Sequence, residues 1–104
     1  METTVKADFD SEANALAITL KEVTPSDPPG REDRLHDRGG VLLVDGNPVF
    51  IEVLYPDLGV DEVLEAAASA YDLDLESLRA AAQSALAAPD REVTLQLSAR
   101  LASA

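Results

Sequence analysis

The sequence predicts an α+β domain in which an antiparallel sheet is covered on one face by two helices. Five segments alternate apolar and polar residues with the period of two that indicates strands. Two further segments repeat apolar residues every three or four positions, which indicates amphipathic helices. The predicted order is ββ-ββ-αα-β, and we expect residues 1–104 to form a single domain with one core.

The first hairpin is predicted from two alternating segments that flank a polar turn. Residues 5–9 alternate in this way, and the following strand places Leu16, Ile18 and Leu20 on one face. Residues 10–14 between them are rich in side chains that hydrogen-bond their own backbone in turns. Together these features predict an antiparallel β-hairpin.

A second hairpin follows a long irregular segment. Residues 24–40 contain several prolines and glycines, so we expect a mobile loop there, with a short strand around Leu35. Residues 40–44 and 49–54 are rich in β-branched and aliphatic side chains. The Asp-Gly pair at positions 45–46 that joins them is a strong hairpin signal.

The period of the apolar pattern changes between residues 60 and 88, which predicts a pair of amphipathic helices. Asp74 is a suitable N-cap for the second helix, and Leu73 can pack on Leu78 as a hydrophobic staple. Residues 92–101 then alternate again and predict the closing strand of the sheet.

The two hairpins resemble a known family. Residues 9–20 follow its opening signature of an aromatic residue, Asp, three variable residues, Asp, Ala, Leu, Tyr, Ile, any residue and Leu. Residues 40–54 are similar to its closing signature, a Gly-Ile-Glu-Ile-Leu strand after a turn. The family is the small bacterial group called domain of unknown function 2283, and the resemblance covers about residues 5–54.

Three positions depart from the family pattern. Asn14 stands where the family has Asp, Ala17 where it has Tyr, and Phe50 where it has Gly. The helices that follow look like an addition to the family's β-sheet module. Because the family has no established activity, the resemblance implies a sheet and supplies no mechanism.

The charge of the chain limits its partners. Twenty acidic and 8 basic residues give a formal net charge of −12. Affinity for nucleic acids comes chiefly from Lys and Arg, so we expect no nucleic-acid partner. The acidity keeps a small protein soluble; the alternatives are an acidic surface for a basic partner protein and mimicry of DNA.

The composition also indicates the cellular compartment in which we expect the protein. The chain has no cysteine, which excludes disulfides and thiolate metal sites. The start of the chain lacks a basic stretch followed by an apolar run, and no apolar run is long enough to span a bilayer. We therefore expect a cytoplasmic protein without a membrane partner.

Two groups of residues resemble metal or proton-transfer sites but lack essential parts. His36 is the only histidine, so no histidine ligand set can form, and we interpret it as a solvated loop residue. The acidic residues at positions 72, 74 and 76 alternate as in a calcium-binding loop. However, Ser77 and Gln83 occupy the positions where that loop needs Gly and Glu. We expect no metal and no cofactor.

The carboxylates of the strands supply one candidate functional residue. Asp8, Asp10, Glu12 and Glu52 could form an acid–base pair only if their surroundings separated two pKa values, and nothing local does so. Glu52 stands out because it interrupts an apolar strand, although alternation would also let it face water or pair across the sheet. We expect no catalytic residues and no enzymatic activity.

The expected function is therefore protein–protein interaction. The chain would be an antitoxin-like or regulatory module that forms a homodimer or binds a basic protein. Small side chains let helices approach closely, so the helix pair can serve either a core or an interface. The expected interface residues are Ala81, Ala82, Ala85, Leu86 and Leu97.

The alternative function is DNA binding by a helix-turn-helix over residues 60–88. The spacing of Ala68, Leu73 and Leu78 matches the buried positions of that motif. The recognition helix would then begin with Asp74 and Glu76, whose carboxylates would face phosphates. This acidity favours a helix pair used for packing.

Overall fold

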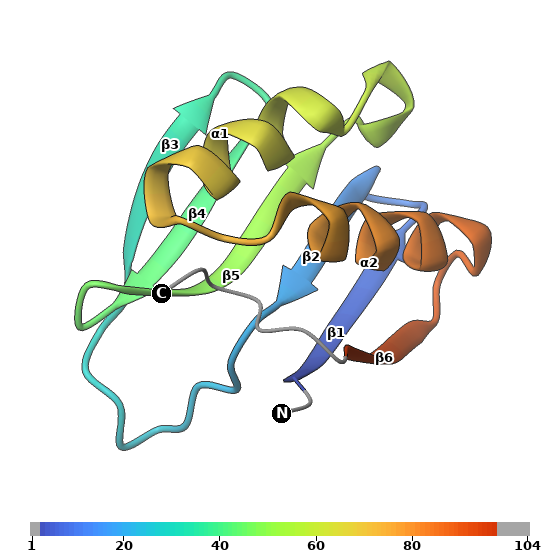
Figure 1. Cartoon of the computed structure of the whole chain (residues 1–104). Helices are drawn as coiled ribbons and strands as arrows, with labels where there is room; N and C mark the ends of the chain where they lie inside the picture. The colour runs from blue at the N-terminus through green and yellow to red at the C-terminus, as the bar shows by residue number, and fades with distance from the viewer. Residues whose placement is uncertain (1–2, 98–104) are drawn as a thin grey trace.

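The computed structural model describes residues 3–97, which form one six-stranded antiparallel sheet and two α-helices (Figure 1). The strands are β1 (Thr3–Asp10), β2 (Ala15–Thr19), β3 (Arg31–His36), β4 (Gly39–Val44), β5 (Asn47–Leu54) and β6 (Glu92–Leu97). A 3-10 turn, η1 (Pro56–Leu58), precedes the helices α1 (Asp61–Tyr71) and α2 (Leu75–Ala87). The strand order is β3-β4-β5-β2-β1-β6. The α+β class predicted from the sequence, with hairpins first and helices on one face, is confirmed.

Both predicted hairpins form with the expected turns. In the β1–β2 turn, the Asp10 carboxylate accepts the backbone N–H groups of Glu12 and Ala13 at 3.0 and 3.1 Å. Between β4 and β5, Asp45 and Gly46 have φ values of 57° and 79°. Positive φ at both central residues is the type I′ geometry, which matches the twist of the flanking strands.

The segment expected to be a loop over residues 24–40 contains a full strand. The expected short strand around Leu35 extends over Arg31–His36 and pairs with β4, so the sheet has six strands rather than five. A register shift between Asp33 and His36 bulges this edge strand. The sequence of β3 is charged and the strand is bulged, so it lacks the apolar alternation by which strands are recognised. Both features are typical of an edge strand, which pairs with a neighbour on one side only.

Two glycines let the strands around this hairpin approach closely. A Cβ at Gly39 would lie 2.2 Å from the Glu52 carbonyl oxygen and 2.9 Å from Cγ1 of Val63. A Cβ at Gly40 would lie 2.4 Å from the Asp33 carbonyl oxygen. Neither position accepts a side chain without movement of the backbone beside it.

Both helices cover the same face of the sheet (Figure 1). Helix α1 packs over β3, β4 and β5, and α2 packs over β1, β2 and β6. The core between them is aliphatic and consists of Val5, Ala7, Leu16, Ile18, Val41, Leu43, Ile51, Val53, Val63, Leu64, Ala67, Leu73, Leu78, Ala81, Ala82 and Ala85. None of the helices in residues 3–97 combines the length and hydrophobicity needed to cross a membrane.

The closing strand predicted over residues 92–101 is present as β6 up to Leu97. Residues 98–101 of that prediction lie outside the described part of the chain. Within it, β6 pairs with β1 from Thr3↔Leu97 to Asp8↔Glu92 and forms one edge of the sheet.

Replacing Leu78 by Ala tests the packing of α2 on the sheet. Leu78 is fully buried, so Leu78→Ala should lower the free energy of unfolding by about 2–5 kcal/mol, through lost apolar contact and the cavity left behind. Leu58 is 66% exposed, and Leu58→Ala should change stability by less than about 0.5 kcal/mol. Urea denaturation of both variants measures this, and equal losses would contradict the described packing.

Candidate functional site

The face of the sheet opposite the helices is its most distinctive surface; we call it the open face. Successive side chains of a strand point to opposite sides, so residues that alternate with the core positions lie here. None of the helices in residues 3–97 packs on this side. The residues assigned to the open face include Lys6, Asp8, Ala15, Ala17, Thr19, Glu32, Gly40, Leu42, Phe50, Glu52, Leu54, Glu92 and Thr94.

The open face carries a cavity of about 130 Å³ over β3, β4 and β5. Its lining combines the half-buried apolar side chains of Leu42 and Phe50 with the carboxylates of Glu32 and Glu52. Glu32 lies opposite Leu42 on the neighbouring strand, and Leu42 lies opposite Phe50 on the next. The cavity is therefore built by cross-strand neighbours, and the hydrogen-bonded sheet holds its walls in register.

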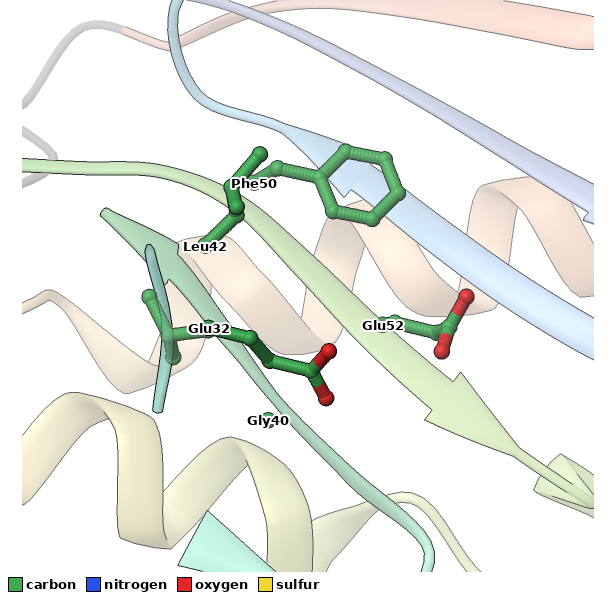
Figure 2. Close-up of a pocket in the computed structure, with 6 residues that line it drawn as sticks. Glu32, Gly40, Leu42, Phe50 and Glu52 are labelled. Atoms are coloured by element: carbon green, nitrogen blue, oxygen red, sulfur yellow. The ribbon is translucent and has the colours of Figure 1, made fainter. Parts of the chain in front are cut away.

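Gly40 separates the two carboxylates of the cavity. It pairs with Glu52 across the β4–β5 ladder and is part of the cavity lining. Figure 2 shows Glu32 extending from β3 across β4, toward the strand that carries Glu52. The absence of a side chain at Gly40 thus lets the β3 backbone at Asp33 and Arg34 lie close against β4.

The carboxylates of Glu32 and Glu52 form few ion pairs with cationic side chains of the chain itself. The Glu32 carboxylate lies 4.0 Å from the Arg34 guanidinium, and both side chains are largely exposed. Within the described residues, Glu52 has no ion-pair partner within 4 Å. Glu52, the functional candidate chosen from the sequence, is therefore an exposed acid beside an apolar hollow.

The rest of the open face is also acidic. Lys6 is its cation on β1, and the Lys6 ammonium lies 2.8 Å from the Glu22 carboxylate. Burial raises the pKa of the Asp8 carboxyl, and the neighbouring carboxylates of Glu92 and Asp10 raise it further. Desolvation and the neighbouring carboxylates thus both disfavour ionisation of Asp8.

A larger hollow of about 420 Å³ lies at the β1–β6 end of the sheet. Its lining consists of Asp8, Phe9, Asp10, Asp90, Arg91 and Glu92. Here the Asp90 carboxylate accepts the backbone N–H of Ser11 at 2.9 Å and its hydroxyl at 2.6 Å. These hydrogen bonds, the hydroxyl bond first, lower the pKa of Asp90. Asp90 therefore ties the β1–β2 turn to the start of β6.

His36 takes part in a structural clamp rather than standing free in a loop. Its Nδ1 accepts the backbone N–H of Arg38 at 3.1 Å, which leaves Nε2 to donate to the Glu62 carboxylate at 3.2 Å. The Arg38 guanidinium also binds Glu62, at 3.0 Å, and donates to the carbonyl oxygen of Gly59 at 2.7 Å. The clamp joins the β3–β4 turn to the start of α1.

The remaining acidic candidates do not converge. Asp74 precedes α2 and accepts a hydrogen bond from the Ser77 hydroxyl, while Asp72 ends α1 in a left-handed conformation. Among residues 3–97, no three His, Asp or Glu side chains are grouped so that they could hold a metal ion.

The residues expected to form an interface have different locations. Ala81, Ala82 and Ala85 are fully buried between α2 and the sheet, so their surface is already used for packing within the chain. Leu86 is half-buried on α2. Leu97 is the last residue of β6, and its side chain lies outside the described part of the structure.

The helix pair presents an acidic exterior. Arg79 is the only basic residue between positions 60 and 88, and its guanidinium contacts the carboxylates of Asp61 and Glu65 at 3.1 and 3.3 Å. Glu62 and Glu76 are exposed on the same helices. A phosphate backbone would meet several carboxylates here and a guanidinium that is already paired.

No protein-family model matches the chain, and comparison with curated proteins and with solved structures gave no significant match. The resemblance of residues 5–54 to domain of unknown function 2283 stays a prediction. What the chain can bind must therefore be argued from its own geometry.

The sequence indicates one functional residue of the cavity, Glu52, as an acid within an apolar strand. Glu32 falls in the segment expected to be a loop, and the pattern does not show which face of their strands Leu42 and Phe50 occupy. The two-residue turn at Asp45-Gly46 by itself would pair Leu42 with Val49, and a register shift between Leu42 and Leu43 places Leu42 opposite Phe50 instead. Only the bulged register of β3 brings Glu32 to them.

Two aspartates should give opposite pH dependences of stability. The pKa of Asp8 is raised on folding, so its ionisation destabilises the native state, and lowering the pH removes that penalty. Asp8→Asn should therefore stabilise the protein at neutral pH, with a gain that disappears below the ordinary pKa of aspartate.

The pKa of Asp90 is lowered on folding, so its contribution is full above the ordinary pKa and is lost as the pH falls through the lowered value. Asp90→Asn should destabilise at neutral pH, with a loss that shrinks in acid. Urea denaturation from neutral to acidic pH measures both. If the two differences from wild type changed with pH in the same direction, the assigned environments would be wrong.

The Arg38 clamp makes a separate prediction. The Arg38 side chain is only 15% exposed, and lysine cannot reproduce its forked hydrogen bonds, so Arg38→Lys should cost roughly 1–3 kcal/mol of stability. Arg34 is 62% exposed, and Arg34→Lys should stay within about 0.5 kcal/mol of wild type. Thermal and urea unfolding compare the pair, and equal effects would argue against the clamp.

Proposed function

We propose that this protein is a non-enzymatic interaction module that binds a basic partner protein through the open face of its sheet. The observation that carries the proposal is the cavity lined by Leu42 and Phe50 and flanked by Glu32 and Glu52. Apolar surface and unneutralised acid occur together there, on a side that the helices leave bare. A polypeptide with cationic and apolar side chains complements both properties.

The distribution of ionisable groups supports a binding role over a catalytic one. In the described residues, Ser77 is the only buried polar side chain, and no buried side-chain nitrogen or oxygen lacks a hydrogen-bond partner. Asp8 is half-buried, but the carboxylates of Glu32, Glu52 and Glu92 are exposed on the open face, where water competes with any proton transfer. Acid–base catalysis favours groups whose pKa values a shielded site drives apart.

The negative charge of the open face favours a basic partner protein over a second copy of the chain. Two copies stacked through their open faces would bring Asp8, Glu32, Glu52 and Glu92 toward the same acids of the partner copy, and like charges in contact are costly. DNA binding through residues 60–88 meets the same obstacle, because Arg79 is already paired.

Self-association is a second proposal, and it has a different location. The outer edge of β6 runs through uncharged residues from Val93 to Leu97, and β6 pairs only with β1 in the described structure. The other edge strand, β3, is bulged and rich in charge, which discourages pairing. We propose that the protein forms a homodimer that extends the sheet at β6. Light scattering during size-exclusion chromatography at tens of micromolar tests this, and a strict monomer contradicts it.

The proposal of a basic partner is tested with a defined probe. Isotope-labelled full-length protein is titrated with a synthetic peptide of alternating arginine and serine and, as a control, with the same peptide carrying glutamate for arginine. We expect amide shifts concentrated in β3, β4 and β5, which line the cavity, and reduced by added salt. The acidic exterior of α1 and α2 serves as an internal control for non-specific attraction.

Two variants sharpen the same titration. Phe50→Ala should weaken binding several-fold because it removes apolar contact beside the cavity, whereas Leu58→Ala should leave the affinity unchanged. Absence of shifts at low salt, or shifts confined to the helices, would refute a partner-binding role for the open face. A gel shift with duplex DNA at low salt tests the DNA-binding alternative.

A further inference from the structure

We propose that the cavity of the open face receives a single arginine side chain of the basic partner. This inference rests on the proposed function and specifies the chemical group that the open face recognises. It concerns a defined recess and not the general acidity of the surface.

The size of the cavity fits one side chain. Its volume is about 130 Å³. For comparison, an engineered apolar cavity of about 150 Å³ in another protein accepts one benzene molecule. A helix or a strand of the partner does not fit in this space, so the partner must insert an individual group.

The apolar lining favours arginine over lysine. Leu42 and Phe50 are half-buried and come from adjacent strands, where they lie opposite each other. The aliphatic stem of a long cationic side chain can pack on such residues while its charged end stays near water. A guanidinium also stacks on aromatic rings and loses less hydration than an ammonium group.

The two acids provide matching acceptors on both sides of the recess. Glu32 comes from β3 and Glu52 from β5, and Gly40 lies between them on β4 (Figure 2). A planar guanidinium has five N–H donors and can bind two carboxylates at once, which a compact ammonium does less well. The only internal competitor among the described ion pairs is Arg34, at 4.0 Å from Glu32.

The larger hollow beside β6 lacks this combination. It contains Arg91, a cation of its own, and the Asp90 carboxylate there is already used by Ser11. The acidic exteriors of the helices likewise hold Arg79 between two carboxylates. Of these acidic surfaces, the cavity of the open face is the one that joins apolar walls to loosely paired acids.

The test uses three five-residue peptides whose central residue is arginine, citrulline or lysine, flanked by valine and serine on each side. Citrulline has nearly the shape of arginine but no charge. Titrations monitored by amide shifts of the full-length protein should show the arginine peptide binding more tightly than the lysine peptide, and the citrulline peptide weakest. The largest shifts should fall on Gly40, Glu52 and their neighbours.

Charge-neutral variants locate the contact. Glu32→Gln and Glu52→Gln should each weaken arginine-peptide binding about 2–5-fold, the range of a partly exposed ion pair, and should leave citrulline-peptide binding unchanged. Glu76→Gln removes the same charge from α2, where Glu76 is exposed, and should leave both affinities unchanged.

The outcomes separate this inference from the proposed function. Equal binding of the arginine and citrulline peptides on the open face would overturn the arginine recess and leave the interaction surface standing. Equal losses for Glu52→Gln and Glu76→Gln would also overturn it, because only net charge would then matter. If neither these peptides nor the alternating arginine–serine peptide binds the open face, the proposed function itself fails.

Discussion

Six strands turn their larger aliphatic side chains to one side of the sheet, and two short helices bury that side. Because Ala81, Ala82 and Ala85 are small, α2 lies close against β1 and β2, and Leu16, Ile18 and Leu78 are sealed completely. This packing uses most of the large apolar residues, whereas Leu42, Phe50 and Leu54 stay on the other side of the sheet. The other side of the sheet is left without a helical cover, and the proposed function depends on that asymmetry.

The hairpin of β3 and β4 determines the position of the cavity on the open face. Gly39 and Gly40 allow backbone contacts that no other residue permits, and Arg38 fixes the turn to the segment before α1 through the carbonyl oxygen of Gly59. Held in this way, β3 carries Glu32 beside the strand pair that bears Leu42 and Glu52. The cavity is thus a consequence of strand register and of the close approach of β3 to β4 that Gly40 permits.

Acidity alone does not distinguish one surface of this protein from another, since a net charge of −12 is spread over the sheet and the helices. What differs is how the acids are engaged. On the helices Arg79 neutralises part of the charge, and at the β1–β2 turn Asp90 is bound by Ser11. Around the cavity, Glu52 has no ion pair among the described residues and sits beside an aromatic ring. For the proposed basic partner, long-range attraction would govern the approach, and the local combination of charge and apolar contact would select the docking position.

The sequence by itself determined the α+β class, both tight hairpins, the two helices and the start of the last strand. Each of these follows from a local signal: alternation, the Asp45-Gly46 turn, or the three-and-four period after Val60. It also singled out Glu52 as an acid in an apolar strand. Only the tertiary structure decided that β3 is an edge strand, that Ala81, Ala82 and Ala85 belong to the core, and that Glu32 approaches Glu52. Those facts depend on pairing between segments distant in sequence, and a local pattern of charges, prolines or alanines is compatible with several such pairings.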